Sequence, residues 1–200
     1  MNGFERRTEE KKKQILDTAF RLMNQPDGHK TMTVDELAKQ ANVAKTTIFK
    51  YFGNKEALVQ EVYKRFITEM STSVEVILSK KESFEKTLLE ISFNKLRFLK
   101  DLDESFYLEM MQQITTKQDD GLSVLMEKFA SDSHAMMLDL FHRGRKEQKI
   151  DLKYSDEFLL LYFQTLAEGL SHPQIYEQLL PYTSNFSEVI IKGISPKNEQ

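Results

Sequence analysis

The stretch from Thr33 to Leu58, TVDELAKQANVAKTTIFKYFGNKEAL, decides the fold of this 200-residue chain. Thr33 is followed three residues later by Glu36, the pattern of a capping box, which marks the start of a helix. Asn42 predicts a tight corner after this helix, because asparagine tolerates a left-handed backbone. Apolar residues recur between these points at i, i+3, i+4 and i+7 and form one stripe: Val34, Leu37, Ala38 and Ala41.

A second short helix is expected directly after this corner. Ile48 and Phe52 fall on its inward side, whereas most of the remaining side chains are polar or basic. Gly53 is suited to end this helix, and Asn54 is suited to cap the next one. Two short helices joined by a three-residue turn, the second polar and basic outside, form a helix-turn-helix.

At these positions the chain resembles the TetR family of bacterial transcriptional regulators. Its matches to the family pattern are Thr33, Ala38, Ala41, Val43, Ile48, Tyr51, Phe52, Lys55 and Leu58. It departs from the pattern at Leu37, Asn42, Ala44 and Phe49, where the family usually has isoleucine, glycine, serine and tyrosine. The last two changes remove a hydroxyl that can cap the second helix and one that touches a DNA phosphate in relatives.

Composition limits the class of protein. The chain has no cysteine, which excludes disulfides and thiolate metal sites. No secretory signal precedes the first helix, and no apolar run approaches the roughly 20 residues that span a bilayer. We therefore expect a cytoplasmic protein without a membrane partner.

Charge is distributed unevenly along the chain. Residues 1–70 hold 13 Lys and Arg against 10 Asp and Glu, whereas the whole chain has 28 against 31, which leaves 15 against 21 for residues 71–200. A basic N-terminal part on an acidic body is typical of a DNA-binding protein with a separate second domain. Chance variation is the alternative explanation.

Helical periodicity continues through the rest of the chain. Thr8 is expected to cap the first helix, behind a loose arm at residues 1–7. A long helix is expected from Glu56 to Ile77, and Pro173 is expected to open a short one. No segment shows the sustained alternation of a half-buried strand, so the predicted class is all-α with about nine helices.

Two domains are expected. The first, residues 1–53, is a three-helix DNA-binding domain that contains the helix-turn-helix. The second, residues 54–200, is a helical domain for effector binding and dimerisation, as the family resemblance implies. A rigid helix rather than a flexible linker is expected to join them.

The outer face of the second short helix is the candidate DNA-binding surface. A helix fits the major groove, where the pattern of donors and acceptors distinguishes all four base pairs. The resemblance implies that Lys55 holds a phosphate. An ordinary solvated helix face is the alternative. The predicted DNA-binding residues are Thr33, Lys45, Thr46, Thr47, Phe49, Lys50, Tyr51 and Lys55.

The family resemblance also implies a homodimer that reads a pseudo-palindromic double-stranded DNA operator. The segment FLLLYFQTLAEGL, residues 158–170, is apolar over more than one face, more than a surface helix hides inside one subunit. A wholly intramolecular core is the alternative. The predicted interface residues are Leu159, Phe163, Leu166, Gly169, Leu170, Val189 and Ile190.

A small-molecule effector is the third partner that the resemblance implies. Nine Met and fourteen Phe suggest an adaptable aromatic interior suited to a lipophilic ligand, although any one such residue is more often part of a plain core. Glu168 stands out because an unpaired buried carboxylate is costly. The candidate pocket residues are Phe106, Tyr107, Met110, Met111, Gln113, Met137, Tyr162, Phe163 and Glu168.

The sequence gives no support for catalysis or for a cofactor. His134, Asp139 and His142 have helical spacing but do not complete a metal-ligand set. Phosphate-binding glycine loops and the HExxH pattern are absent from the sequence. We therefore expect a ligand-released repressor, with a helix-turn-helix adaptor or architectural protein controlled by a protein partner as the alternative.

Overall fold

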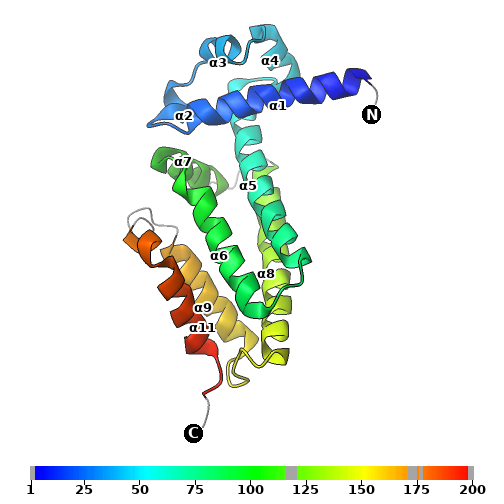
Figure 1. Ribbon diagram of the computed structural model, residues 1–200. Helices are drawn as coiled ribbons and strands as arrows, with labels where there is room; N and C mark the ends of the chain where they lie inside the picture. The colour runs from blue at the N-terminus through cyan, green and yellow to red at the C-terminus, as the bar shows by residue number, and fades with distance from the viewer. Residues whose placement is uncertain (1–2, 116–120, 171–174, 176–177, 198–200) are drawn as a thin grey trace. The chain divides into compact units, whose positions relative to one another are not determined.

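The computed structural model describes residues 3–115, 121–170, 175 and 178–197, and these residues contain helices and no strand (Figure 1). The all-α class is therefore confirmed, with a few more helices than the nine expected. The elements are α1 (Gly3–Met23), α2 (Gly28–Thr31), α3 (Val34–Gln40), α4 (Lys45–Phe52), α5 (Lys55–Ser79), α6 (Phe84–Lys100), α7 (Glu104–Thr115), α8 (Leu122–Lys146), α9 (Asp156–Gly169), the 3-10 helix η1 (Leu180–Tyr182) and α11 (Thr183–Ile194). The helix start expected at Pro173 lies outside the described residues.

The chain folds into two compact units. The first unit comprises Met1–Glu69 and Leu102–Met126, and the second comprises Met70–Asp101 and Glu127–Gln200. These units are defined by how compactly the chain packs. The predicted division between residues 53 and 54 separates a DNA-binding part from an effector-binding part, and it stays a prediction. Helices α5 and α8 each begin in the first unit and end in the second.

The first unit packs around a small aromatic core. Phe106 of α7 is fully buried, and its ring meets those of Phe20 and Tyr63 edge-on at 5.3 and 5.1 Å between centroids. Burial raises the pKa of the Tyr63 hydroxyl, and the nearby charge of Glu109 raises it further, so this phenol stays neutral. The core anchors α1, α5 and α7 beneath the helix-turn-helix formed by α3 and α4.

Helix α1 begins earlier than the sequence pattern indicated. It starts at Gly3, so the expected loose arm is helical from that residue onward and Thr8 lies inside the helix. The physical reason is that no glycine or proline interrupts residues 4–23, and the pair Arg6–Glu10 at i, i+4 supports the first turns with a contact of 3.6 Å.

The second unit has its own core between α6, α8, α9 and α11. Gly144 permits the closest approach in this core, because a Cβ atom there would lie 2.8 Å from both Phe84 and Ile150. Arg145, at the end of α8, donates to Asp156 at the start of α9 and ties these helices together. The buried core residues are Phe84, Leu88, Leu140, Phe141, Ile150, Leu159, Ile190 and Ile194.

Candidate DNA-binding surface and ligand cavity

The first helix of the helix-turn-helix begins where the capping pattern predicted. Thr33 has an extended backbone, and its hydroxyl accepts a hydrogen bond of 3.1 Å from the Glu36 amide. Asn42 has a φ of 48°, the left-handed corner that the sequence indicated. The amide of Val43 then donates to the carbonyl of Ala38 at 3.0 Å and closes the turn. Contacts between neighbours along the chain therefore form the turn between α3 and α4.

Helix α4 is held by its apolar side and by its ends. Ile48 is buried and Phe52 half-buried, as expected. Ala44 caps the helix without a side-chain hydrogen bond, because it lacks the hydroxyl usual in the family. Gly53 ends the helix with a φ of 81°, and the Asn54 side chain accepts from the Ala57 amide at 2.7 Å at the start of α5.

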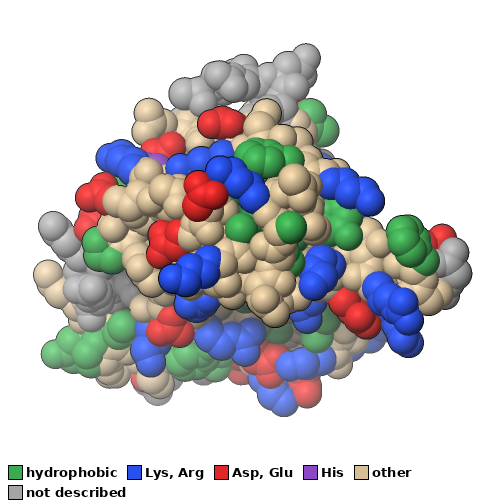
Figure 2. Space-filling view, turned by 90° about the horizontal axis from the view of Figure 1, so that it is seen from above, with side chains coloured by type: hydrophobic (Ala, Val, Ile, Leu, Met, Phe, Trp, Pro, Cys, Tyr) green, Lys and Arg blue, Asp and Glu red, His purple; other side chains and the backbone are tan. Residues whose placement is uncertain are grey.

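The predicted DNA-binding residues share one neighbourhood of the first unit. They come from the start of α3, from α4 and from the first residue of α5. Figure 2 views the molecule from above and shows Lys and Arg side chains separated by Asp and Glu rather than merged into one basic patch. The exposed members are Thr33, Lys45, Thr46, Phe49 and Lys50, and the half-buried members are Thr47, Tyr51 and Lys55.

One contact on this surface was not expected from the sequence. The Nζ atom of Lys45 lies 2.9 Å from Oδ1 and 3.0 Å from Oδ2 of Asp35. Asp35 lies in the first turn of α3, ten residues before Lys45, and was not among the predicted residues. Only the crossing of the two helices brings this acid and this base together.

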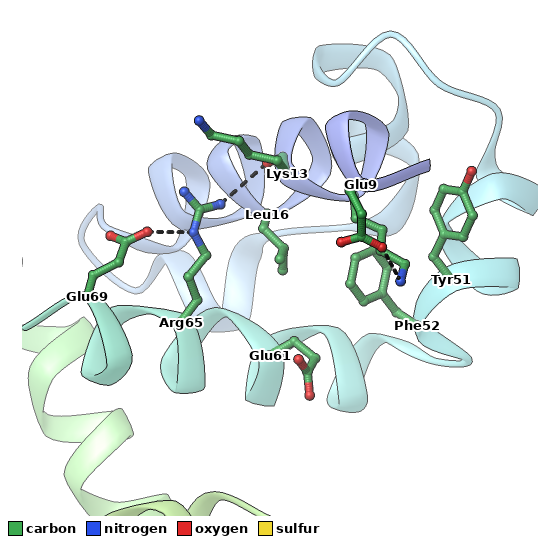
Figure 3. Close-up of a pocket in the computed structure, with 9 residues that line it drawn as sticks. Glu9, Lys13, Leu16, Tyr51, Phe52, Glu61, Arg65 and Glu69 are labelled. Carbon is green, nitrogen blue, oxygen red and sulfur yellow. Dashed lines mark hydrogen bonds and ion pairs between the residues drawn. The ribbon is translucent and has the colours of Figure 1, made fainter. Parts of the chain in front are cut away.

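A depression on the surface of the first unit lies between α1 and α5, beside the end of α4 (Figure 3). It has a volume of about 490 Å³ and holds charges of both signs. Arg65 is engaged by Asp17 at 2.6 Å and by Glu69 at 2.7 Å, and Lys12 contacts Glu9 at 3.1 Å. Because these charges offset one another locally, this depression is not suited to bind an anion, and the charge of Lys12 is partly neutralised.

The second unit contains an apolar cavity of about 380 Å³. Of the residues predicted to bind a ligand, Met137 of α8 and Phe163 of α9 line it. The other lining residues were not among the predicted ligand-binding residues, since periodicity does not tell which face of α6 meets α9. They are Leu88, Ile91, Ser92, Ala130, Ser133, His134, Leu160, Gln164, Leu166, Ala167, Leu170, Phe186 and Ile190.

The two remaining candidates from α9 have other surroundings. Tyr162 packs its ring against Phe158 and Phe163 at centroid distances of 6.2 and 5.5 Å. Glu168 is exposed and accepts a hydrogen bond of 2.9 Å from Gln164, one turn earlier. The expectation of a buried carboxylate at this position is wrong, because Glu168 lies on the solvent side of its helix.

The five candidates from α7 belong to the first unit rather than to this cavity. Phe106 and Met110 are buried in the core of that unit, which is the plain-core alternative for these residues. Tyr107, Met111 and Gln113 are half-buried on the same helix.

The predicted interface residues are divided between the inside and the surface of the second unit. Leu159 and Ile190 are buried in its core, which differs from the outward position expected for them. Phe163, Leu166 and Leu170 line the cavity instead. Val189 is 67% exposed, and a Cβ atom added at Gly169 meets no atom of the residues that the structure describes within 4 Å. Two residues that the prediction omitted, Phe158 and Leu161, are exposed on α9.

Groups of three or more His, Asp or Glu side chains that would hold a metal ion do not occur among the described residues. His142 instead contacts Asp156, with its Nε2 atom 3.1 Å from a carboxylate oxygen. Within the same described ranges, no helix is long and apolar enough to cross a bilayer.

Residues 15–62 match the family model described as bacterial regulatory proteins of the tetR family. This match covers the second half of α1, the helix-turn-helix whose geometry is given above and the start of α5. The N-terminal part of the chain is a DNA-binding domain of the TetR family. Its departures from the family pattern, at Ala44 and Phe49, therefore affect individual contacts within a DNA-binding domain of this family.

Relatives extend the likeness beyond this domain. The chain is 34% identical over 91 residues to the HTH-type transcriptional regulator YhgD of Bacillus subtilis, which covers 46% of this chain and 47% of that protein. The fold is similar to that of the fatty acid degradation regulator FadR from Bacillus halodurans, with a TM-score of 0.66, 18% identity and coverage of 92% and 95%. The fold is also similar to that of FadR from Bacillus subtilis in complex with stearoyl-CoA. The TM-score is 0.64, the sequence identity is 20%, and the alignment covers 90% of this chain and 98% of that chain. The likeness in fold to these two structures thus extends over most of this chain.

Proposed function

We propose that this TetR-family regulator is a homodimeric repressor that leaves a pseudo-palindromic operator when a lipophilic small molecule occupies its second unit. The observation that carries the proposal is the pairing, in one chain, of a helix-turn-helix with an apolar cavity in a separate unit. The helix-turn-helix would recognise the DNA sequence, and the cavity would bind the small molecule that regulates it.

The exposed apolar side chains of α9 and α11 support a dimer. Leu161 is 63% exposed and Val189 is 67% exposed, although both are more favourable when buried. Pairing α9 and α11 with their twofold mates as a four-helix bundle would cover them. Two recognition helices would then enter successive major grooves, which is the reason for a palindromic operator.

The lining of the cavity supports an acyl chain as the ligand. Its volume of about 380 Å³ lies in the usual range for small-molecule sites, roughly 300–1,000 Å³, and its walls are mostly aliphatic and aromatic. Four polar side chains interrupt them: Ser92, Ser133, His134 and Gln164. The likeness in fold to FadR bound to stearoyl-CoA favours a long-chain acyl-CoA or the corresponding fatty acid.

Release from DNA would follow from a two-state equilibrium. The ligand favours a conformation of the second unit in which the two recognition helices no longer match adjacent major grooves. Because coupling is reciprocal, operator and ligand must weaken each other's binding by the same factor. This equality is measurable without knowledge of the structural change.

The first test is selection of bound DNA from a random pool by the full chain. A pseudo-palindrome supports the proposal, whereas weak sequence preference would support the architectural alternative. The selected operator is then titrated with protein in the presence of stearoyl-CoA, stearate or coenzyme A alone. Release by the first two but not by coenzyme A identifies the acyl chain as the recognised group.

A variant of the cavity tests the site itself. Ser92→Phe fills the cavity from α6, so it should keep operator binding but lose the response to stearoyl-CoA. Ser79→Phe is the matched control, because Ser79 is exposed at the end of α5 and bonds to its own helix backbone as Ser92 does. Equal ligand responses of the two variants would remove this cavity from the mechanism.

A further inference from the structure

Lys45 and Asp35 form an ion pair on the surface that meets DNA, and its position is unusual. Lys45 is the first residue of α4, and Asp35 lies in the first turn of α3. The ammonium lies 2.9 and 3.0 Å from the two carboxylate oxygens. The Lys45 and Asp35 side chains are 48% and 77% exposed, so both keep hydrogen-bonding capacity toward solvent.

Stability does not explain this pair. Exposed ion pairs contribute little to folding, because solvent screens them and two long side chains lose freedom. A carboxylate near the recognition helix also opposes the attraction of phosphates, which dominates DNA affinity. Glu36 already supplies the first turn of α3 with a carboxylate that favours the helix dipole. Asp35 therefore weakens general DNA binding without a structural need for it.

We propose, on the basis of the proposed operator binding, that Asp35 and Lys45 act as one unit that selects a G·C base pair. In the major groove the O6 atom of guanine accepts and the N4 atom of cytosine donates. These two atoms are partners in the Watson–Crick pair, so they lie at hydrogen-bond distance, about 2.9 Å. The ammonium and the carboxylate have the same spacing and the complementary roles: Lys45 donates to guanine, and Asp35 accepts from cytosine.

The neighbouring atoms of each base pair decide between G·C and T·A. A T·A pair also places an acceptor, O4, beside a donor, N6. Its thymine methyl group would lie beside the ammonium, and its adenine N7 acceptor would lie beside the carboxylate, which is repulsive. In G·C the ammonium gains a second acceptor, guanine N7, and the carboxylate meets only a carbon-bound hydrogen. Asp35 is thus the residue that determines specificity. Lys45, positioned by its ion pair with Asp35, donates the hydrogen bond to guanine.

The experiment uses the full chain and its selected operator. We expect each half-site to contain one G·C pair whose exchange for T·A weakens wild-type binding by about 5- to 100-fold. Asp35→Ala should reduce the ratio of affinities for the G·C and T·A operators at that base pair alone. Lys45→Ala should reduce the preference for G·C at the same base pair. Asp35→Asn should instead shift the cytosine position toward adenine, because an asparagine amide bonds adenine N6 and N7 together.

Glu36→Ala is the matched control. It removes the same charge from the same helical turn, but Glu36 bonds to Gln40 and not to Lys45. Both variants should gain affinity for scrambled DNA, whereas only Asp35→Ala should change the ratio at the G·C pair. Circular dichroism melting curves of the two should agree, since both lose one carboxylate near the start of α3.

The outcomes separate this inference from the operator binding on which it rests. If the wild type selects no palindrome, the proposed function fails, and this inference fails with it. If the wild type selects a palindrome but Asp35→Ala matches Glu36→Ala at every position, operator binding stands and the inference is overturned. If Asp35→Ala and Lys45→Ala reduced the base preference at two different positions, the inference that the two residues select one base pair together would also be overturned.

Discussion

Helices α4 and α9 face solvent in opposite ways. Helix α4 buries Ile48 and exposes lysine and threonine side chains. Helix α9 buries Leu159 but also exposes two large apolar side chains, Phe158 at 48% and Leu161 at 63%. Each surface is suited to a different partner: a charged polymer for α4, and another apolar surface for α9.

The energetics of the two surfaces differ accordingly. Contacts to phosphates depend steeply on salt and are nearly independent of sequence. Burial of apolar side chains depends weakly on salt and contributes about 1.5–3 kcal/mol for each large residue. Salt therefore distinguishes substitutions on α4 from those on α9, even though both end in weaker operator binding.

The largest effect is expected from Leu161→Lys on α9. In a dimer that covers this position, an unpaired buried charge costs about 3–5 kcal/mol, which weakens association more than 100-fold. The protomer should keep its melting temperature, because Leu161 is 63% exposed within it. Analytical ultracentrifugation over a range of concentrations measures the change.

Leu152→Lys is the control for this substitution. Leu152 is 79% exposed and lies before α9, so the same exchange should leave the dimer intact. Equal dissociation constants for the two variants would show that the exposed face of α9 is not the interface.

Gly169→Leu should have the second-largest effect. A Cβ atom at Gly169 meets no atom of the described residues within 4 Å, so the cost is expected to come from a partner copy. Overpacking costs typically 1–3 kcal/mol, and a twofold axis applies it twice. The series Gly169→Ala and Gly169→Leu should weaken the dimer progressively in sedimentation, while protomer stability rises slightly because glycine is a poor helix former. A dimer unaffected by leucine would place this end of α9 outside the interface.

Lys55→Ala tests the other surface and should have a smaller effect. Lys55 is the first residue of α5 and is predicted to hold a phosphate. Its loss should weaken binding to all sequences alike and reduce the slope of log affinity against log salt by about one unit. Lys146→Ala, at the end of α8, removes the same charge from the second unit and should leave the slope unchanged. A changed base preference in Lys55→Ala would contradict the phosphate role.

The sequence predicted the first unit better than the second because the helix-turn-helix depends on neighbours along the chain. The Thr33 cap, the left-handed Asn42 and the terminal Gly53 each follow from backbone chemistry within a few residues. The pair of Asp35 with Lys45 was missed because it depends on the angle between two helices.

The second unit was less predictable because α9 is apolar over more than one face. All six residues of FLLLYF are apolar, so each is suited to the buried face of the helix. Periodicity therefore could not distinguish buried Leu159 from exposed Leu161. The same ambiguity placed Glu168 inside, although it lies on the solvent side. The cavity joins α6, α8, α9 and α11, which are far apart in sequence, and only packing determines which of their faces meet.

The smallest effect concerns Phe49, where the family usually has tyrosine. Phe49 is 40% exposed on α4, so it lies on the surface that is predicted to bind DNA. A tyrosine hydroxyl there would donate to a phosphate, and a neutral hydrogen bond contributes about 0.5–1.5 kcal/mol. Phe49→Tyr should therefore tighten binding by a few-fold to about tenfold, and equally on operator and scrambled DNA, because phosphates are common to both.

Titrations of wild type and Phe49→Tyr on both DNAs at one salt concentration measure this gain. The ring keeps its packing in either protein, so the melting temperature should not change and affinity alone reports the new bond. Tightening on the operator alone, or weakening on both, would assign Phe49 a base contact instead, such as packing against a thymine methyl group. In that case α4 would share one property with α9: an exposed aromatic side chain whose role is apolar contact with its partner.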